Sequence, residues 1–112
     1  MTASTARSLH RLADEQIAAA KAASAGRSAQ SVFGGSDKTL RQTVLALAAG
    51  NGLADHESPG EATLLVLRGR VRLNAPSGNV EAAAGDYLEI PAERHSLDAL
   101  EDSAVLLSVV PR

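Results

Sequence analysis

Two of the three histidines, His56 and His95, are the side chains best suited to chemistry in this sequence. An imidazole titrates near neutral pH and is a common ligand for transition metals. A bound Zn, Fe, Mn or Ni ion needs about three protein ligands, so two imidazoles from separate strands would begin a metal site without completing it. The alternative is that both are ordinary polar residues, hydrogen-bonded to their neighbours or to water. Both interpretations stay open at this point.

Other familiar kinds of active site are absent from the sequence. The chain has no cysteine, which excludes disulfides, thiolate metal sites and cysteine nucleophiles. No serine lies in a GXSXG context, and Gly34-Gly35 is not followed by the Lys-Ser/Thr pair of a phosphate loop. His10 falls among charged residues, and we interpret it as part of a solvated face. The net charge of −2, without a basic cluster, indicates no nucleic-acid partner.

The length and the hydropathy of the chain limit where it works. Its 112 residues are within the range of a single domain. No apolar stretch approaches the length of a membrane span, and Asp14 and Glu15 interrupt the alanine-rich N-terminus. We therefore expect no membrane partner, no signal peptide and a cytoplasmic location.

Residues 7–25 are predicted to form a helix, because alanine is abundant and neither proline nor glycine interrupts them. Gly26 follows at a position suited to a C-cap. The apolar residues of this segment recur at spacings of three and four, so the helix is expected to pack on a larger body. They are Leu9, Leu12, Ala13, Ile17 and Ala20. We assign residues 1–30 to a helical extension and residues 31–112 to a β domain.

The rest of the chain has the pattern of short antiparallel strands separated by turn signals such as Asn51-Gly52. About seven short strands in this arrangement predict an all-β sandwich or small barrel. Residues 61–74 read as one long strand with a kink or bulge at Gly69. The other clear strands are expected at residues 39–49, 79–83, 85–91, 95–100 and 104–110.

The stretch "LLVL" at residues 64–67 is apolar on both faces of its strand. One face can fill the core of the molecule, and the other needs a second cover, from the N-terminal helix or from a partner subunit. Aromatic residues make up only 2% of the chain, so the core must be built from smaller side chains. Both observations favour a homodimer.

Two stretches resemble the motifs of the cupin family, G(X)5HXH(X)3-4E(X)6G and G(X)5PXG(X)2H(X)3N. Gly50 is followed by five residues and then His56, and Gly69 closes the first motif. Gly85 is followed by five residues and then Pro91, with His95 shortly after. The resemblance implies a jelly-roll β-barrel of antiparallel strands over roughly residues 40–110. It also implies a small-molecule cavity and, in many members, one divalent transition metal (Zn, Fe, Mn or Ni).

The chain departs from these motifs at most of the metal-ligand positions. Ser58 replaces the second histidine of the first motif, and Ala62 falls where the family has its glutamate. In the second motif, Ala99 takes the place of the closing asparagine. His56 and His95 are the two matches, so the resemblance implies a metal only if another side chain completes the site. Glu61 is the possible third ligand, but it would need a bulge to turn inward from the opposite face of its strand.

Polar residues beside the expected cavity are candidates for ligand binding. We select Arg41, Gln42, Glu93 and Arg94 together with the two histidines. For Arg94, an exposed loop arginine is an equally good interpretation.

Three functions fit these observations. The first is a barrel that binds or senses a small molecule and has a degenerate metal site. The second is a metal-dependent enzyme of the dioxygenase, isomerase or decarboxylase type that uses both histidines. The third is a structural module whose sheet and helix serve in dimerisation. The sequence does not decide whether the protein is an enzyme.

Overall fold

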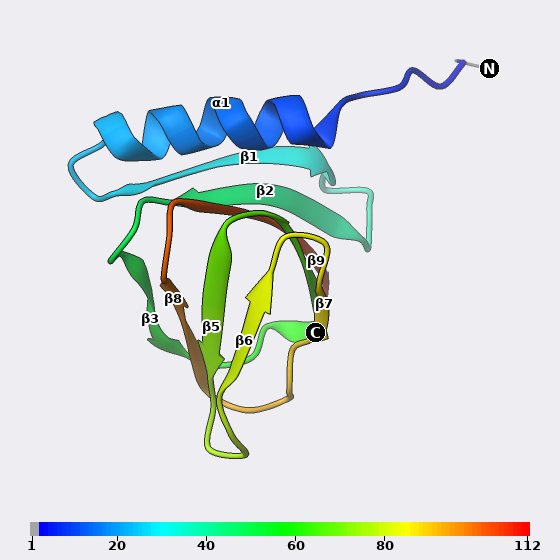
Figure 1. Ribbon diagram of the computed structural model, residues 1–112. Coiled ribbons are helices and arrows are strands. Elements are labelled where there is room, and N and C mark those ends of the chain that lie inside the picture. Colours follow the sequence, from blue (N-terminus) through cyan, green and yellow to red (C-terminus); the bar gives the residue numbers. More distant parts are fainter. Residues whose placement is uncertain (1–2) are drawn as a thin grey trace.

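The computed structural model describes residues 3–112. Within them one helix precedes nine strands, which form a five-stranded sheet in the order β1-β2-β9-β4-β7 and a four-stranded sheet in the order β3-β8-β5-β6 (Figure 1). Every strand pairing is antiparallel. The elements are α1 (Leu9–Ala22), β1 (Arg27–Phe33), β2 (Arg41–Leu47), β3 (Gly52–His56), β4 (Gly60–Arg68), β5 (Arg70–Asn74), β6 (Val80–Ala83), β7 (Tyr87–Glu89), β8 (His95–Ala99) and β9 (Ser103–Pro111).

The predicted helix is confirmed, with ends a little shorter than expected. Ser8 caps its first turn, because the hydroxyl accepts a hydrogen bond from the Arg11 amide at 3.1 Å. The helix ends at Ala22 with Ala23 as its cap, so Gly26 lies in the turn that follows and is not the C-cap. The helix packs with the predicted face, of which Leu12, Ala13 and Ala20 are buried and Leu9 and Ile17 are partly buried.

Helix α1 supplies the second cover that the doubly apolar strand β4 requires. Leu64 and Val66 point into the core between the sheets, whereas Leu65 and Leu67 belong to the cluster packed against the helix. The ion pair between Asp14 and Arg68, at 3.0 Å, joins the helix to the end of the same strand. The pattern of residues 64–67 is thus satisfied within one chain and gives no separate argument for a partner subunit.

Gly69 divides the predicted long strand into two strands that belong to different sheets. Its φ of 78° lies in the left-handed region that favours glycine. A Cβ atom at this position would also collide with the carbonyl oxygen of Asp102 and the hydroxyl of Ser103. The chain therefore turns here from β4 in one sheet to β5 in the other.

Aliphatic side chains from the two sheets fill the space between them, and none of the buried cluster is aromatic. Hydrogen-bonded pairings hold each sheet together, and none among residues 3–112 joins the two sheets into a closed barrel. The all-β class with an N-terminal helix is confirmed, and the architecture is a sandwich of two antiparallel sheets. The core cluster consists of Leu47, Leu64, Val66, Val71, Leu73, Ala82, Leu97, Ala99 and Val105.

Two strands were not predicted from the sequence, β1 and β3. Most residues of β1 are exposed, so the strand lacks the apolar alternation that would have revealed it. The boundary expected between residues 30 and 31 falls inside this strand. Across residues 3–112, the one helix is too short and too polar to span a membrane.

Candidate functional site

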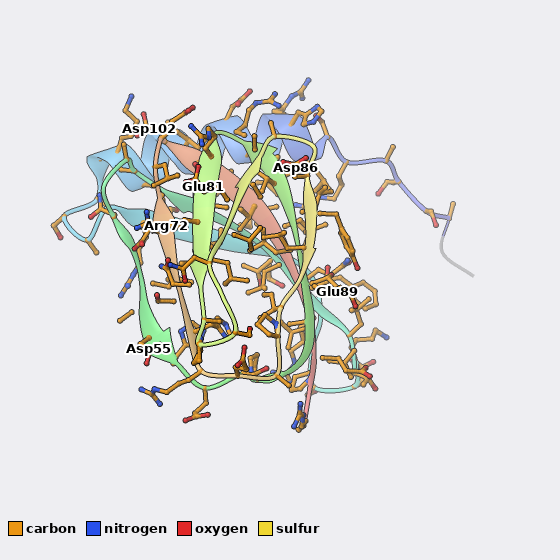
Figure 2. All side chains as sticks on the ribbon, turned by 60° about the horizontal axis from the view of Figure 1, so that its bottom comes forward. Asp55, Arg72, Glu81, Asp86, Glu89 and Asp102 are labelled. Carbon is orange, nitrogen blue, oxygen red and sulfur yellow. The ribbon has the colours of Figure 1, made fainter. Side chains whose placement is uncertain are left out.

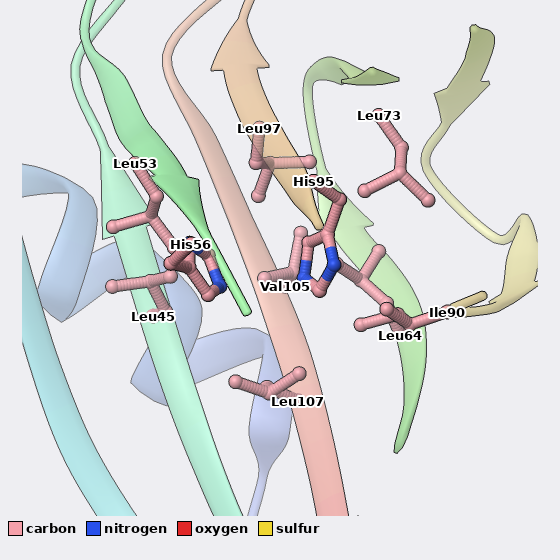
Figure 3. Close-up of a pocket in the computed structure, with 10 residues that line it drawn as sticks. All are labelled: Leu45, Leu53, His56, Leu64, Leu73, Ile90, His95, Leu97, Val105 and Leu107. Atoms are coloured by element: carbon pink, nitrogen blue, oxygen red, sulfur yellow. The ribbon is translucent and has the colours of Figure 1, made fainter. Parts of the chain in front are cut away.

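Strands β3 and β8 bring His56 and His95 directly opposite each other. His56 is the last residue of β3 and His95 is the first residue of β8. The ring centroids are 4.5 Å apart, and the rings meet edge to face at 64°. Figure 3 shows the two rings together at the pocket, surrounded by aliphatic side chains. The structure thus joins the two histidines that the sequence singled out.

Backbone carbonyls fix the tautomer of both rings. Nδ1 of His56 lies 2.7 Å from the carbonyl oxygen of Ala54, and Nδ1 of His95 lies 2.8 Å from that of Glu93. A carbonyl oxygen only accepts hydrogen bonds, so each Nδ1 must carry the proton. In the neutral state, Nε2 of each ring then keeps a free lone pair.

The two histidines are the polar residues of a small, partly open and otherwise aliphatic pocket (Figure 3). His95 is 4% exposed and His56 is partly buried. The pocket has a volume of about 30 Å³, which is room for about two water molecules. The other lining residues are Leu45, Leu53, Leu64, Leu73, Ile90, Leu97, Val105 and Leu107.

The side chains around this pocket do not fit a metal ion held by three protein ligands. No group of three histidine, aspartate or glutamate side chains suited to a metal occurs within residues 3–112. Ala62 is buried and has no donor atom. The hydroxyl of Ser58 donates a hydrogen bond to the carbonyl of Gly60 at 3.1 Å. Among the described residues, the pocket therefore offers a metal ion only the two imidazoles.

Glu61 lies away from the histidine pocket. The register pairs Glu61 with Val110 and Ala62 with Val109, and strand alternation places Glu61 on the face opposite to Ala62. Its side chain is exposed and lines surface grooves instead. The irregularity in β4 occurs between Val66 and Arg68, too far along the strand to turn Glu61 inward.

The two predicted ligand-binding residues of β2 lie on opposite faces of the strand. Arg41 and Leu45 lie on the same face of β2, because side chains alternate along a strand, and Leu45 lines the pocket. Arg41 pairs with Val109, which lies two residues beyond the pocket residue Leu107. The Arg41 side chain is therefore on the pocket face, at the rim farthest from the core. Gln42 points outward and donates a hydrogen bond to the Ser108 hydroxyl at 3.1 Å.

Arg94 fastens the ends of β3 and β8 together beside the histidines. Its guanidinium donates to Asp55 at 2.7 Å and to Glu57 at 3.0 Å, the two residues that flank His56. The hydrogen bonds to Asp55 and then to Glu57 raise the pKa of Arg94 above its usual value. Arg94 is exposed, as the loop interpretation expected, but its contacts are with the protein.

Glu93 contributes to the site through its backbone. Its carbonyl oxygen accepts the hydrogen bond from His95, and its carboxylate accepts one from the Ser77 hydroxyl. The side chain is thus engaged outside the pocket.

A polar network that the sequence did not reveal covers the outer face of β5 and β8. Arg72 donates to Asp98 and to Asn74, each at 3.0 Å, and Asn74 donates to Asp98 at 2.9 Å. The Asn74 amide, followed by the Arg72 guanidinium, holds the pKa of Asp98 below its usual value. Figure 2 shows Arg72 and the labelled carboxylates around the outside of the sandwich, and none of them lines the histidine pocket.

No protein-family model matches the chain, and no curated protein sequence matches it. Several solved structures, however, are similar to the chain. A conserved protein of unknown function from Streptococcus pyogenes is 26% identical, with a TM-score of 0.70 over 80% of this chain and 78% of that one. A cupin superfamily protein from Desulfitobacterium hafniense is 15% identical, with a TM-score of 0.69 over 77% of this chain and 78% of that one.

A third similar structure is an enzyme. Salicylate 1,2-dioxygenase from Pseudaminobacter salicylatoxidans is 17% identical, with a TM-score of 0.73 over 89% of this chain. The match covers only 33% of the dioxygenase chain. At this identity, the likeness concerns the fold alone.

Proposed function

The chain has the fold of the cupin superfamily, and from that premise we propose that it is a small-molecule-binding domain whose ligand contacts His56 and His95. We also propose that the sandwich is a jelly-roll barrel. The order β2-β9-β4-β7 in one sheet and β3-β8-β5-β6 in the other supports this, because the connections repeatedly cross between the sheets.

The observation that carries the binding proposal is a pair of oriented imidazoles in an aliphatic pocket. Every other residue that lines the pocket is Leu, Ile or Val. No buried side-chain nitrogen or oxygen among residues 3–112 lacks a hydrogen-bond partner, so Nε2 of each ring, for which the protein supplies none, is accessible to solvent and to a ligand. A few convergent polar groups in an apolar pocket are typical of small-molecule sites.

The size of the pocket limits the ligand. A volume of about 30 Å³ accepts a group of only a few non-hydrogen atoms. The remainder of any larger ligand would lie across the rim near Arg41 and Val109.

A titration of the imidazole resonances tests the proposal. Protein with labelled histidines is titrated by NMR with a library of ligands of a few heavy atoms. We expect at least one compound to shift the His56 and His95 rings and to leave His10, on the exposed surface of α1, unchanged. Compounds that bind without moving either pocket ring would place the site elsewhere and refute the proposal.

A metal-dependent enzyme is the second candidate, because a dioxygenase shares the fold. The donor set around the pocket argues against it. Metal analysis of protein purified without a histidine tag or chelator separates the two functions. Near-stoichiometric iron, manganese, nickel or zinc, lost in a His56→Ala/His95→Ala double variant, would favour the enzyme.

A structural module that forms a homodimer is the third candidate. The small pocket is compatible with it, and so is strand β1, an edge strand of seven mostly exposed residues. An unpaired edge strand offers backbone hydrogen-bonding groups to a second chain, and Arg27 is the one charged residue along this edge. We propose a homodimer that pairs through β1. Sedimentation that gives a monomer at micromolar concentration would exclude it.

A further inference from the structure

We infer, on the premise of the proposed function, that the histidine pocket selects neutral compounds whose polar head is an amino group with two N–H donors, as in a primary carboxamide. Three features of the pocket lead to this class. They are two ring nitrogens that accept hydrogen bonds, a lining without charged carboxylate or ammonium groups, and a volume that admits one small polar group.

The pocket offers hydrogen-bond acceptors and, among its lining side chains, no donors. Nδ1 of His56 and of His95 donates to a backbone carbonyl, so Nε2 of each neutral ring presents a lone pair. The other side chains of the lining are Leu, Ile and Val, which neither donate nor accept. These side chains therefore form a hydrogen bond with a polar group in the pocket only if that group donates.

Nε2 of His95 is accessible although the residue is only 4% exposed. No buried side-chain nitrogen within residues 3–112 lacks a hydrogen-bond partner, and the protein provides none for this atom, so Nε2 belongs to the small part of the side chain that stays accessible. Because His95 lines the pocket, we take the pocket to be the space from which a ligand donates to Nε2 (Figure 3).

The surroundings of the rings favour a neutral ligand over an ion. The two carboxylates that flank His56 in the sequence, Asp55 and Glu57, are both paired with Arg94, and neither lines the pocket. An ammonium group would be buried among aliphatic side chains without an opposite charge, which is costly. A carboxylate would meet two lone pairs and no side-chain donor, so it is disfavoured as well.

Both rings border one small space, so a single atom with two donors is the most compact partner for them. The ring centroids are 4.5 Å apart, and the pocket of about 30 Å³ has room for about two water molecules. A hydroxyl has one donor and leaves one ring without a partner, whereas an NH2 group has two. An aliphatic amine is protonated near neutral pH, as the Lys side chain is. The NH2 group of a primary carboxamide stays neutral, and its carbonyl oxygen remains solvated when it faces the open side of the pocket.

Matched probes separate the number of donors from size and charge. Butyramide and N-methylpropionamide are isomers, but the first has two N–H donors and the second has one. Methyl propyl ketone has the skeleton of butyramide with a methyl group in place of the NH2 group, so it is neutral and has no donor. Butyrate has a charged oxygen in the same place, and butylammonium is the cationic probe.

NMR titration of the full chain, isotope-labelled in its histidine nitrogens, measures both binding and the contact at Nε2. The titration is run at about pH 8.5, above the range in which an imidazole ordinarily titrates. We expect butyramide to move the Nε2 resonances of His56 and His95 to saturation and to leave those of His10 unchanged. N-methylpropionamide should bind about threefold more weakly or less well. The ketone, butyrate and butylammonium should bind at least about tenfold more weakly, which corresponds to about 1.4 kcal/mol.

The same spectra test the tautomer of the rings before any ligand is added. The nitrogen resonances of both pocket rings should be those of an imidazole with its proton on Nδ1. A proton on Nε2 of either ring would give the pocket a donor and would overturn the inference.

The variant His56→Leu assigns the preference to the pair of rings. It keeps one acceptor, so it should weaken butyramide and bring the affinities for butyramide and N-methylpropionamide within about twofold of each other. His56 is partly buried at the end of an edge strand, and if the variant does not fold, the ranking of the probes on the native chain decides. His10→Leu, on the exposed surface of α1, is the matched control and should bind every probe as the native chain does.

The possible failures are distinguishable. Equal affinity for butyramide and the ketone, or tighter binding of butyrate, overturns the inference and leaves the binding function intact as long as a compound moves the two pocket rings. The same holds if library compounds move the rings and butyramide does not. If neither these probes nor the wider library moves either pocket ring, the proposed function and the inference fall together.

Discussion

Replacing His95 by leucine distinguishes a ring kept for binding from a ring kept for folding. His95 is 4% exposed. Within the described residues, the one hydrogen bond of its imidazole is the contact from Nδ1 to the carbonyl of Glu93. If the imidazole serves the ligand, a side chain of similar size without polar atoms should fold at least as well.

The expected change in the free energy of unfolding is small. Losing one hydrogen bond costs about 1 kcal/mol, and Glu93 is only partly buried, so water can satisfy its carbonyl. Burying a leucine side chain contributes about 2 kcal/mol. The cavity of about 30 Å³ beside the ring gives the new side chain room, which limits overpacking. We expect His95→Leu to range from unchanged to about 1 kcal/mol more stable than the native chain.

Urea unfolding followed by circular dichroism measures this change in free energy. The comparison requires that the slope of the unfolding free energy against urea concentration is the same for both proteins. Leu97→Ala is the positive control, because Leu97 is 3% exposed in the same strand and its truncation should cost about 2–5 kcal/mol. The same His95→Leu protein should no longer bind the compounds that shift the pocket rings of the native chain. A destabilisation of more than about 2 kcal/mol would refute the reasoning, because the imidazole would then be part of the fold.

Three further predictions concern other parts of the structure. Gly69→Ala should destabilise the protein by about 2–4 kcal/mol in urea unfolding, from the left-handed backbone and the collision with the Asp102 carbonyl; a cost below about 1 kcal/mol would contradict this. The lowered pKa of Asp98 adds stability that is present above about pH 4 and is lost as the pH falls through the folded value. Because this side chain is 44% exposed, the amount is only a few tenths of a kcal/mol, and it should be missing from the pH profile of Asp98→Asn. Arg94→Gln should increase the mobility of the His56 ring in NMR relaxation and leave His10 unaffected. If the His56 ring is equally mobile in the native chain and the variant, the contacts of Arg94 with Asp55 and Glu57 are not needed to hold it.

Local patterns were sufficient to predict much of the fold. The helix follows from alanine content and apolar spacing, and the strands of the core follow from alternation between turn signals. Strand β1 could not be predicted in this way, because its residues are mostly exposed and its contacts are distant in sequence. It pairs with β2, and its Ser28 and Gln30 form hydrogen bonds with Gln16 of the helix.

The candidate site was likewise predictable only where local sequence patterns determine it. The histidines were found from their spacing, and strand parity would have placed Arg41 on the pocket face and Gln42 on the opposite face once the strand was known. The aliphatic lining comes from six strands and the loop after β7, and no local signal in the sequence brings it together. The role of Arg94 depends on the pairing of β3 with β8, which is a contact between distant parts of the chain.

The hydrogen bond that holds each ring in place favours a binding role for the two histidines over an incidental pair. Both rings direct Nδ1 to the carbonyl of the residue two positions back. This contact leaves each Nε2 without a protein partner and fixes the plane of each ring, as backbone carbonyls do for imidazoles that ligate metals. Here the third donor of a metal site is missing among the described residues, and Ala62 stands at the position that the motif gives to glutamate. The pocket therefore keeps two oriented acceptors, and we expect a ligand that fits it to offer hydrogen-bond donors.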